Sequence, residues 1–144
     1  LELLRTLEEP KAPPPLSSTI TSLAFSPDGQ TLASGSYAVR LWRVSDGSLL
    51  RTMIGAEANA NNGFFSGVSS LAFSPDGQTL ASGGGNATVR LWRISDGNLM
   101  QTMEGNLDDN IIGGSGETHL AFSPDGQILA ISGGHGKVRL WQKP

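Results

Sequence analysis

Short stretches of apolar residues recur along the chain, and each is bounded by Ser, Pro, Asp or Gly. In the clearest case, residues 68–73 (VSSLAF) are followed by the turn sequence Ser-Pro-Asp-Gly and then by residues 78–82 (QTLAS). Runs of this length predict β-strands. The sequence between them predicts a tight turn, because Pro presets φ, Asp can bond its own backbone and Gly accepts a left-handed conformation. The pattern therefore predicts a β-hairpin.

Two further strands complete the unit. Residues 88–94 contain the sequence Val-Arg-Leu-Trp, and Ser95-Asp96-Gly97 turns the chain into a last strand, residues 98–103. Four short strands joined by tight turns predict an antiparallel four-stranded meander, which is the shape of one propeller blade.

The unit occurs three times at a spacing of 48 to 50 residues. The phenylalanine that ends the first strand and the tryptophan of the third strand recur at matched positions: Phe25, Phe73 and Phe122, and Trp42, Trp92 and Trp141. A fixed period of this length indicates a repeat architecture. Within a single segment spanning residues 1–144, we expect blade 1 at residues 20–54, blade 2 at 68–104, and three strands of blade 3 at 118–142.

The order of these motifs resembles the WD40 repeat. A strand ends in Ala-Phe-Ser-Pro-Asp-Gly, and Leu-Ala-Ser-Gly, Val-Arg-Leu-Trp and a Gly turn into Leu-x-x-Thr follow it. The resemblance covers essentially the whole chain and implies an all-β protein made of three WD40-like β-propeller blades. It also implies a non-catalytic scaffold for protein–protein interaction.

Several family features are altered. The terminal Trp-Asp dipeptide is replaced by Trp-Arg or Trp-Gln, and the Gly-His dipeptide before the first strand is missing. The hydrogen-bond network of His, Ser, Asp and Trp that ties family blades together therefore cannot form as a set. We expect parts of it to persist between the tryptophans and Ser34, Ser82 and Ser132, with more of the stability coming from packing.

The two ends of the chain set the phase of the repeat. Leu4-Arg5-Thr6-Leu7 matches residues 50–53, so residues 1–7 read as a fourth, outermost strand, whereas the chain closes on a third strand at residues 138–141. In whole propellers such a strand completes the last blade. Three blades are too few to surround a channel, since propellers have 4 to 8.

We therefore expect the opening strand of one copy to complete blade 3 of another copy in a closed ring. A homodimer with six blades is favoured, and a homotrimer with nine is second. A segment cut from a longer propeller is an alternative. The residues expected to form this self-assembly latch are Leu4, Thr6, Leu7, Val138, Leu140 and Trp141.

The connections between blades are long and differ from one another, at residues 8–19, 55–67 and 105–117. In the family they lie on one face of the ring, with the turns before the third strands. Their apolar residues either pack over the blades or form a binding face for a protein or peptide partner. The candidate partner-face residues are Leu16, Tyr37, Phe64, Phe65, Asn86, Ile111, Ile112 and His135.

Composition removes several classes of function. The chain has no cysteine, a net charge of −3 and no basic stripe, so it offers no zinc-thiolate site and no surface for nucleic acid. No apolar run is long enough to span a membrane, and the lack of a signal-peptide pattern favours the cytoplasm. Residues 133–138 lack the Ser or Thr of a phosphate loop, and residues 108–110 lack the ligand spacing of a calcium loop.

We therefore expect no catalytic residues, no cofactor and no metal. The alternative to an interaction scaffold is a purely structural or engineered propeller ring or fragment that has no partner other than itself.

Overall fold

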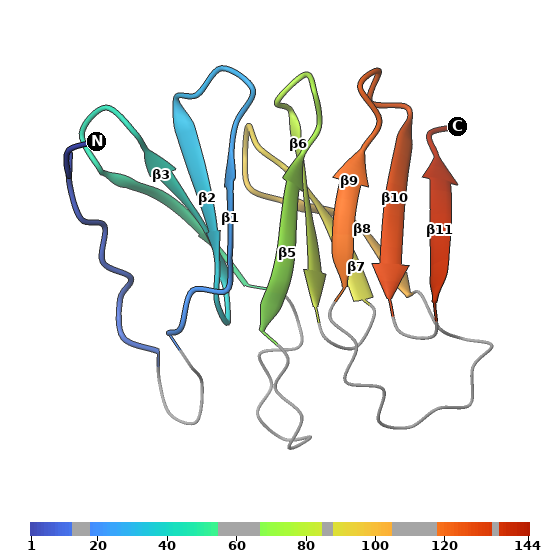
Figure 1. Ribbon diagram of the computed structural model, residues 1–144, viewed down its shortest axis with the longest axis horizontal. Coiled ribbons are helices and arrows are strands. Elements are labelled where there is room, and N and C mark those ends of the chain that lie inside the picture. The colour runs from blue at the N-terminus through green and yellow to red at the C-terminus, as the bar shows by residue number, and fades with distance from the viewer. Residues whose placement is uncertain (13–17, 55–66, 85–87, 105–117, 134–135) are drawn as a thin grey trace.

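The computed structural model describes residues 1–12, 18–54, 67–84, 88–104, 118–133 and 136–144, and the structural statements below concern these ranges. These residues form β-strands and turns but no helix (Figure 1). The strands are β1 (Ser22–Phe25), β2 (Thr31–Gly35), β3 (Val39–Arg43), β4 (Leu49–Met53), β5 (Val68–Phe73), β6 (Thr79–Gly84), β7 (Thr88–Arg93), β8 (Leu99–Glu104), β9 (His119–Phe122), β10 (Ile128–Gly133) and β11 (Lys137–Gln142).

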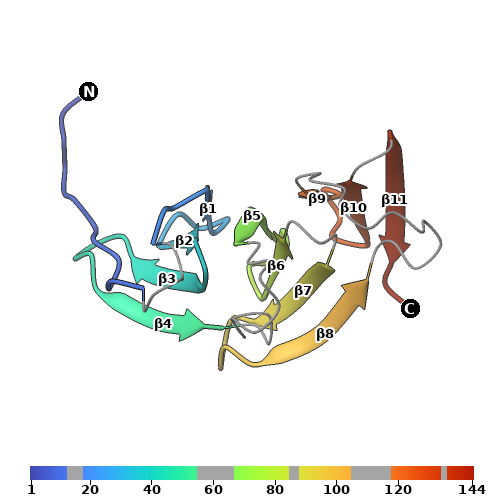
Figure 2. The same ribbon diagram turned by 90° about the horizontal axis from the view of Figure 1, so that it is seen from below.

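The strands form three antiparallel sheets, as the repeat predicts. Blade 1 has the order β1-β2-β3-β4, blade 2 has β5-β6-β7-β8, and blade 3 has the three strands β9-β10-β11. Figure 2 shows the blades side by side in an open arc, with β1, β5 and β9 on the concave side and β4 and β8 on the convex side. The expectation of an all-β fold built from meander blades is confirmed.

The Ser-Pro-Asp-Gly turn has the local chemistry that the sequence indicates. In blade 2, Gly77 has φ +72°, and the carboxylate of Asp76 accepts hydrogen bonds from Ser74 Oγ at 2.5 Å and from the backbone N–H of Gln78 at 3.0 Å. These bonds stabilise the ionised carboxylate and lower the pKa of Asp76, the Ser74 hydroxyl having the largest effect. The same contacts recur in the other two copies, so the turn fixes the hairpin and its register.

The apolar core lies between the blades. One cluster joins blade 1 to blade 2, and a second joins blade 2 to blade 3. The buried members of the first are Ala33, Val39, Leu41 and Met53 from blade 1 and Leu71, Leu80 and Trp92 from blade 2. Those of the second are Ala81, Val89 and Met103 from blade 2 and Leu129 and Ile131 from blade 3. Each blade is thus stabilised by its neighbours, because one sheet cannot bury both of its faces alone.

The tryptophan–serine contact forms in two blades. Trp42 Nε1 donates to Ser34 Oγ at 2.9 Å, and Trp92 Nε1 donates to Ser82 Oγ at 2.8 Å. All four side chains belong to buried residues, so both indole N–H groups are satisfied inside the protein.

In blade 3 the expectation for Ser132 is wrong. Ile131 pairs with Arg139 in the way that Ser82 pairs with Arg90, whereas Ser132 pairs with Val138. Because successive strand residues point to opposite faces, Ser132 lies on the face away from the position that its serine counterparts occupy. Blade 3 has a buried isoleucine in place of the hydroxyl.

Candidate assembly and partner surfaces

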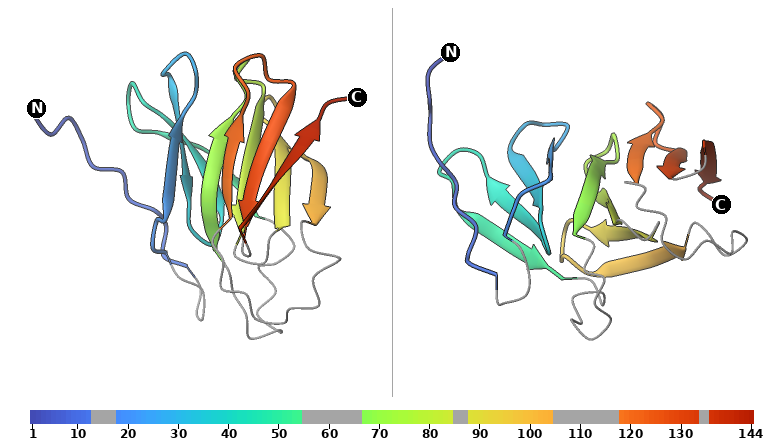
Figure 3. Two further views of the ribbon diagram at one scale, coloured as in Figure 1. Left: turned by 45° about the vertical axis from the view of Figure 1, so that its right-hand side comes forward. Right: turned by 60° about the horizontal axis from the view of Figure 1, so that its bottom comes forward.

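The N-terminal segment lies against the outer flank of blade 1, as Figures 2 and 3 show. Arg5 donates from Nη2 to the carbonyl oxygen of Ser45 at 2.9 Å, and a methyl group placed on Gly47 would lie 3.1 Å from Arg5 Cδ. Both contacts are to the turn between β3 and β4. The segment is therefore docked on blade 1 although it forms no strand there.

These contacts match those that a true fourth strand makes. Arg51 of β4 donates to the carbonyl oxygens of Ser95 and Asp96, both at 2.9 Å, in the equivalent turn of blade 2. A methyl group placed on Gly97 would lie 3.0 Å from Arg51 Cδ. Arg5 thus occupies the place of Arg51, and residues 1–7 occupy the place of the fourth strand of a blade that would precede blade 1.

A buried ion pair fixes the N-terminal segment to blade 1. Glu9 and Arg40 form a salt bridge of 2.9 Å between Oε2 and Nη1, and their side chains are only 3% and 2% exposed. The Glu9 carboxylate also accepts hydrogen bonds from Ser34 Oγ at 3.1 Å and from Ser36 Oγ at 2.6 Å. The carboxylate of Glu9 therefore joins the Ser34–Trp42 pair and extends it to the N-terminal segment.

Arg40 has a second partner. Its Nη2 donates to the Tyr37 hydroxyl at 2.8 Å, and its guanidinium carbon lies 5.0 Å from the centre of the Tyr37 ring. A buried guanidinium is costly unless it is paired and hydrogen-bonded, and Glu9 and Tyr37 bind its two terminal nitrogens, whereas its Nε is buried without a hydrogen-bond partner. Sequence analysis missed Glu9 and Arg40. The available signal was Arg40 itself, a charged residue that lies between apolar residues of the third strand and recurs in every copy.

Blade 1 has one uncovered apolar face. Leu23 and Phe25 of β1 are each 62% exposed. Their counterparts in blade 2, Leu71 and Phe73, pack in the cluster between blades 1 and 2, where Leu71 is only 8% exposed. The difference arises because Leu71 and Phe73 pack against blade 1, whereas no blade formed by the described residues packs against Leu23 and Phe25.

Blade 3 has the complementary uncovered face. On β11, Val138 is 66% exposed and Leu140 is 68% exposed, and Trp141 is also exposed. Their counterparts in β3, Val39 and Leu41, are buried against blade 2. Among the strands of the described residues, β11 pairs with β10 alone.

The structure does not bring the predicted latch residues together within one chain. Leu4 is exposed and Leu7 is half-buried against blade 1, whereas Val138, Leu140 and Trp141 lie on β11 at the other end of the arc (Figure 2). Thr6 is exposed between Arg5 and Leu7. The two halves of the predicted latch therefore lie at opposite ends of the arc.

A comparison with protein-family models matches the WD domain, G-beta repeat, at residues 2–50, 59–93 and 97–142. The chain belongs to the WD40 repeat family. The third match spans β8 to β11, and the first includes most of the N-terminal segment. A comparison with curated proteins found no match.

Most of the partner-face residues expected of this WD40 chain lie outside the described residues: Leu16, Phe64, Phe65, Asn86, Ile111, Ile112 and His135. Tyr37 is described, and it is half-buried with its hydroxyl bonded to Arg40. The strand ends nearest these positions, such as the end of β4 and the start of β5, lie at one end of the blades, opposite the Ser-Pro-Asp-Gly turns (Figure 1).

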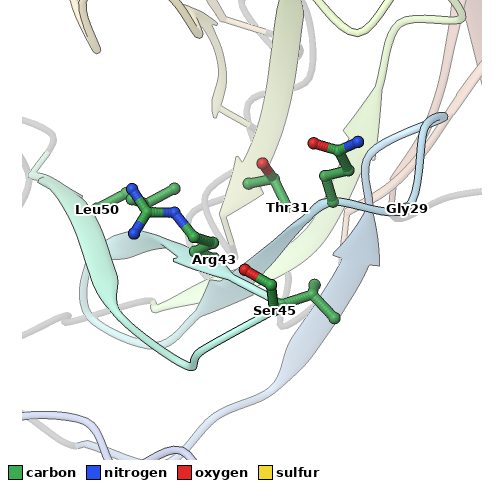
Figure 4. A pocket seen from close by; sticks show the side chains of 7 residues that line it. Gly29, Thr31, Arg43, Ser45 and Leu50 are labelled. Atoms are coloured by element: carbon green, nitrogen blue, oxygen red, sulfur yellow. The ribbon is translucent and has the colours of Figure 1, made fainter.

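A shallow depression of about 500 Å³ lies on blade 1, at the end of the blades that carries the Ser-Pro-Asp-Gly turns (Figure 4). Its lining residues are Gly29, Gln30, Thr31, Arg43, Val44, Ser45 and Leu50. None of these side chains is a carboxylate or an imidazole, and the guanidinium of Arg43 is paired with Asp46 at 3.0 Å. The depression therefore lacks a general base or a paired nucleophile.

Asp46 is held ionised by its own turn. The backbone N–H of Ser48, its hydroxyl and the Arg43 guanidinium together lower the pKa of Asp46 to about 2. This is turn chemistry of the same kind as in the Ser-Pro-Asp-Gly turns. Among the described residues, no group of His, Cys, Asp and Glu is arranged to hold a metal ion, and no helix is long and apolar enough to cross a membrane.

Proposed function

We propose that this WD40 chain is a non-catalytic scaffold for protein–protein interaction that completes its propeller by head-to-tail self-assembly. WD40 repeats generally serve as protein-interaction scaffolds. The observation that supports self-assembly is the pair of uncovered faces at the two ends of the arc. Leu23 and Phe25 on blade 1 and Val138 and Leu140 on blade 3 are exposed, although their counterparts are packed between blades.

The two faces are halves of one interface that the chain already contains. Between blades 1 and 2, β3 contributes Val39 and Leu41, and the facing surface of blade 2 contributes Leu71 and Phe73. Blade 3 presents the first half of that set and blade 1 presents the second. A second copy therefore offers each uncovered face a complementary surface, and burial of apolar area drives the association.

Such contacts are heterologous, so they form a ring when the rotation closes. Two copies give six blades, which lies within the usual range, and three copies give nine. We favour the homodimer. The ring requires neither cofactor nor metal, and its loop-bearing end would present the connections between blades to a protein or peptide partner.

The mass of the protein in solution tests self-assembly. We expect light scattering at micromolar concentration to give twice the mass of one chain. Three times that mass would show a homotrimer instead of a homodimer. Leu140→Asp should produce monomers because it places a charge on the β11 face. Leu99→Asp is the matched control, since Leu99 is an exposed leucine on β8, away from both faces. A monomeric wild type contradicts self-assembly, and it is the result expected if blades from further sequence cover these faces.

The scaffold role needs a separate test. Phe64→Ala combined with Phe65→Ala should abolish capture of a partner while leaving the mass and the melting temperature unchanged. A large fall in the melting temperature would instead mean that these residues pack on the blades. A wild type that captures nothing supports a purely structural ring.

A further inference from the structure

The N-terminal segment contacts blade 1 at the turn between β3 and β4 and at Arg40, whereas Leu23 and Phe25 of β1 remain exposed. We propose that the buried Glu9–Arg40 pair holds residues 1–7 in a fourth-strand position, so that they present a preformed edge on which β11 of a second copy docks with Arg139 opposite Thr6. This inference rests on the proposed self-assembly and specifies its surface, its register and the residue that positions it.

The register follows from the pairing inside the chain. In blade 1, β3 pairs with β4 so that Val39 lies opposite Met53 and Arg40 lies opposite Thr52. Blade 2 repeats this, with Arg90 opposite Thr102. The two third strands thus pair with their fourth strands in the same register.

The contacts of Arg5 fix the corresponding positions in the N-terminal segment. Since Arg5 occupies the place of Arg51, Thr6 corresponds to Thr52 and Leu7 corresponds to Met53. When β11 takes the place of a third strand, Arg139 then lies opposite Thr6. Val138 then lies opposite Leu7, so the half-buried side chain of Leu7 covers the exposed side chain of Val138.

The ion pair explains why the edge is formed before a second copy arrives. In β4 and β8, the fourth strand is held by hydrogen bonds to a third strand. Residues 1–7 have no such partner in the described part of the chain, and the contacts of Arg5 are exposed. The buried contact is Glu9, whose carboxylate bonds Arg40, Ser34 and Ser36.

Release of the segment would leave the Arg40 guanidinium without its carboxylate, and such unpaired buried charges are strongly unfavourable. Glu9 is thus a positioning residue for the edge. A segment held in place also loses less conformational entropy on docking than a free arm does, which favours association.

Two introduced cysteines test the register, because the chain has none of its own. Directly opposite strand residues lie close enough for a disulfide. We expect Thr6→Cys combined with Arg139→Cys to form an interchain disulfide on mild oxidation, giving a covalent dimer or trimer on a non-reducing gel. Arg90→Cys with Thr102→Cys is the positive control, since this pair lies opposite within one chain. Thr6→Cys with Leu140→Cys is the out-of-register control and should stay unlinked.

An unlinked Thr6–Arg139 variant beside a linked positive control would overturn the docking of β11. A disulfide closed within a single chain would overturn it as well, because the edge would then be used by the same copy.

Glu9→Gln tests the positioning role, with Glu8→Gln as the matched control. Glu8 is the exposed neighbour, and its substitution makes the same change of charge. Glu9→Gln should speed tryptic cleavage after Arg5 by about tenfold or more, because loss of a buried charge partner favours local opening. It should also lower the yield of the Thr6–Arg139 disulfide, whereas Glu8→Gln should change neither.

Tryptic cleavage tests the positioning role of Glu9, and the interchain disulfide tests the docking of β11. Cleavage is measured on the single Glu9→Gln and Glu8→Gln chains at a concentration where the protein is monomeric, so it reports on Glu9 even if no ring forms. Equal cleavage in the two variants overturns the role of Glu9 whether or not the chain assembles. Faster cleavage in Glu9→Gln without any interchain disulfide supports the positioning role and overturns the docking.

Discussion

Two equivalent leucines should respond differently to the same substitution. Leu71 and Leu23 occupy the same position in blades 2 and 1, yet Leu71 is buried between blades and Leu23 is exposed. We expect Leu71→Ala to lower the free energy of unfolding by about 2–5 kcal/mol, the range for large-to-small changes in a packed core. In a monomeric chain, Leu23→Ala should cost about 1 kcal/mol or less, because little of its side chain is withdrawn from water.

The proposed self-assembly would add a second effect to Leu23→Ala. Full burial of a leucine side chain contributes about 1.5–3 kcal/mol, and some three-fifths of Leu23 is available for burial by a second copy. The interface therefore loses about 1–2 kcal/mol in Leu23→Ala, which raises the dissociation constant by about five- to thirtyfold.

The assay pairs urea unfolding with the dependence of mass on concentration. Leu71→Ala should unfold at lower urea, and Leu23→Ala should dissociate at higher protein concentration while its monomer unfolds nearly as the wild type does. An unchanged dissociation constant in Leu23→Ala would refute the assignment of this face to the ring interface. A loss below about 0.5 kcal/mol in Leu71→Ala, the size of an ordinary surface substitution, would refute the core between blades 1 and 2.

Three further outcomes follow from the turns and the buried hydrogen bonds. Ser82→Ala leaves the buried Nε1–H of Trp92 without its acceptor and should lower the free energy of unfolding by about 1–3 kcal/mol, as measured by urea unfolding. An unchanged urea midpoint would contradict this expectation. Asp46 has its pKa lowered from 3.8 to about 2, so its contribution to stability is complete above pH 4 and is lost as the pH falls toward 2. Asp46→Asn should therefore flatten the fall in melting temperature across that range, and an identical fall would contradict the assignment. Gly97→Ala places a side chain at φ +73° and 3.0 Å from a neighbouring arginine carbon, so it should destabilise by more than the roughly 1–2 kcal/mol expected for Gly136→Ala, where φ is +65° and the space is open. Equal losses would mean that the neighbour moves freely.

The local structure of the blades could be predicted because its causes are local. The Ser74-Pro75-Asp76-Gly77 turn contains its own acceptor, its own donors and its left-handed glycine, so four residues specify the hairpin. The predicted strand bounds in blade 2 agree with the observed ones to within two residues. Antiparallel order follows from such short connections, since tight turns join only antiparallel neighbours.

The ion pair could not be predicted because its members are far apart in the sequence. Glu9 lies 31 positions before Arg40, and the sequence shows only that one is acidic and the other interrupts an apolar strand. The error at Ser132 has a related cause. Matching copies by residue type aligned a serine with a serine, whereas the register of β10 and β11 depends on the distance from the turn and places Ile131 there.

The burial of a side chain cannot be predicted from the repeated sequence alone. Leu23 and Leu71 are the same residue in the same hairpin, and Leu41 and Leu140 are the same residue in the same third strand. In each pair one side chain is buried and the other is exposed, because exposure depends on whether another blade follows or precedes. Local sequence therefore cannot distinguish core from surface in such a protein. Blades 1 and 3 therefore carry, on their outer faces, residue types that are buried between blades elsewhere in the chain.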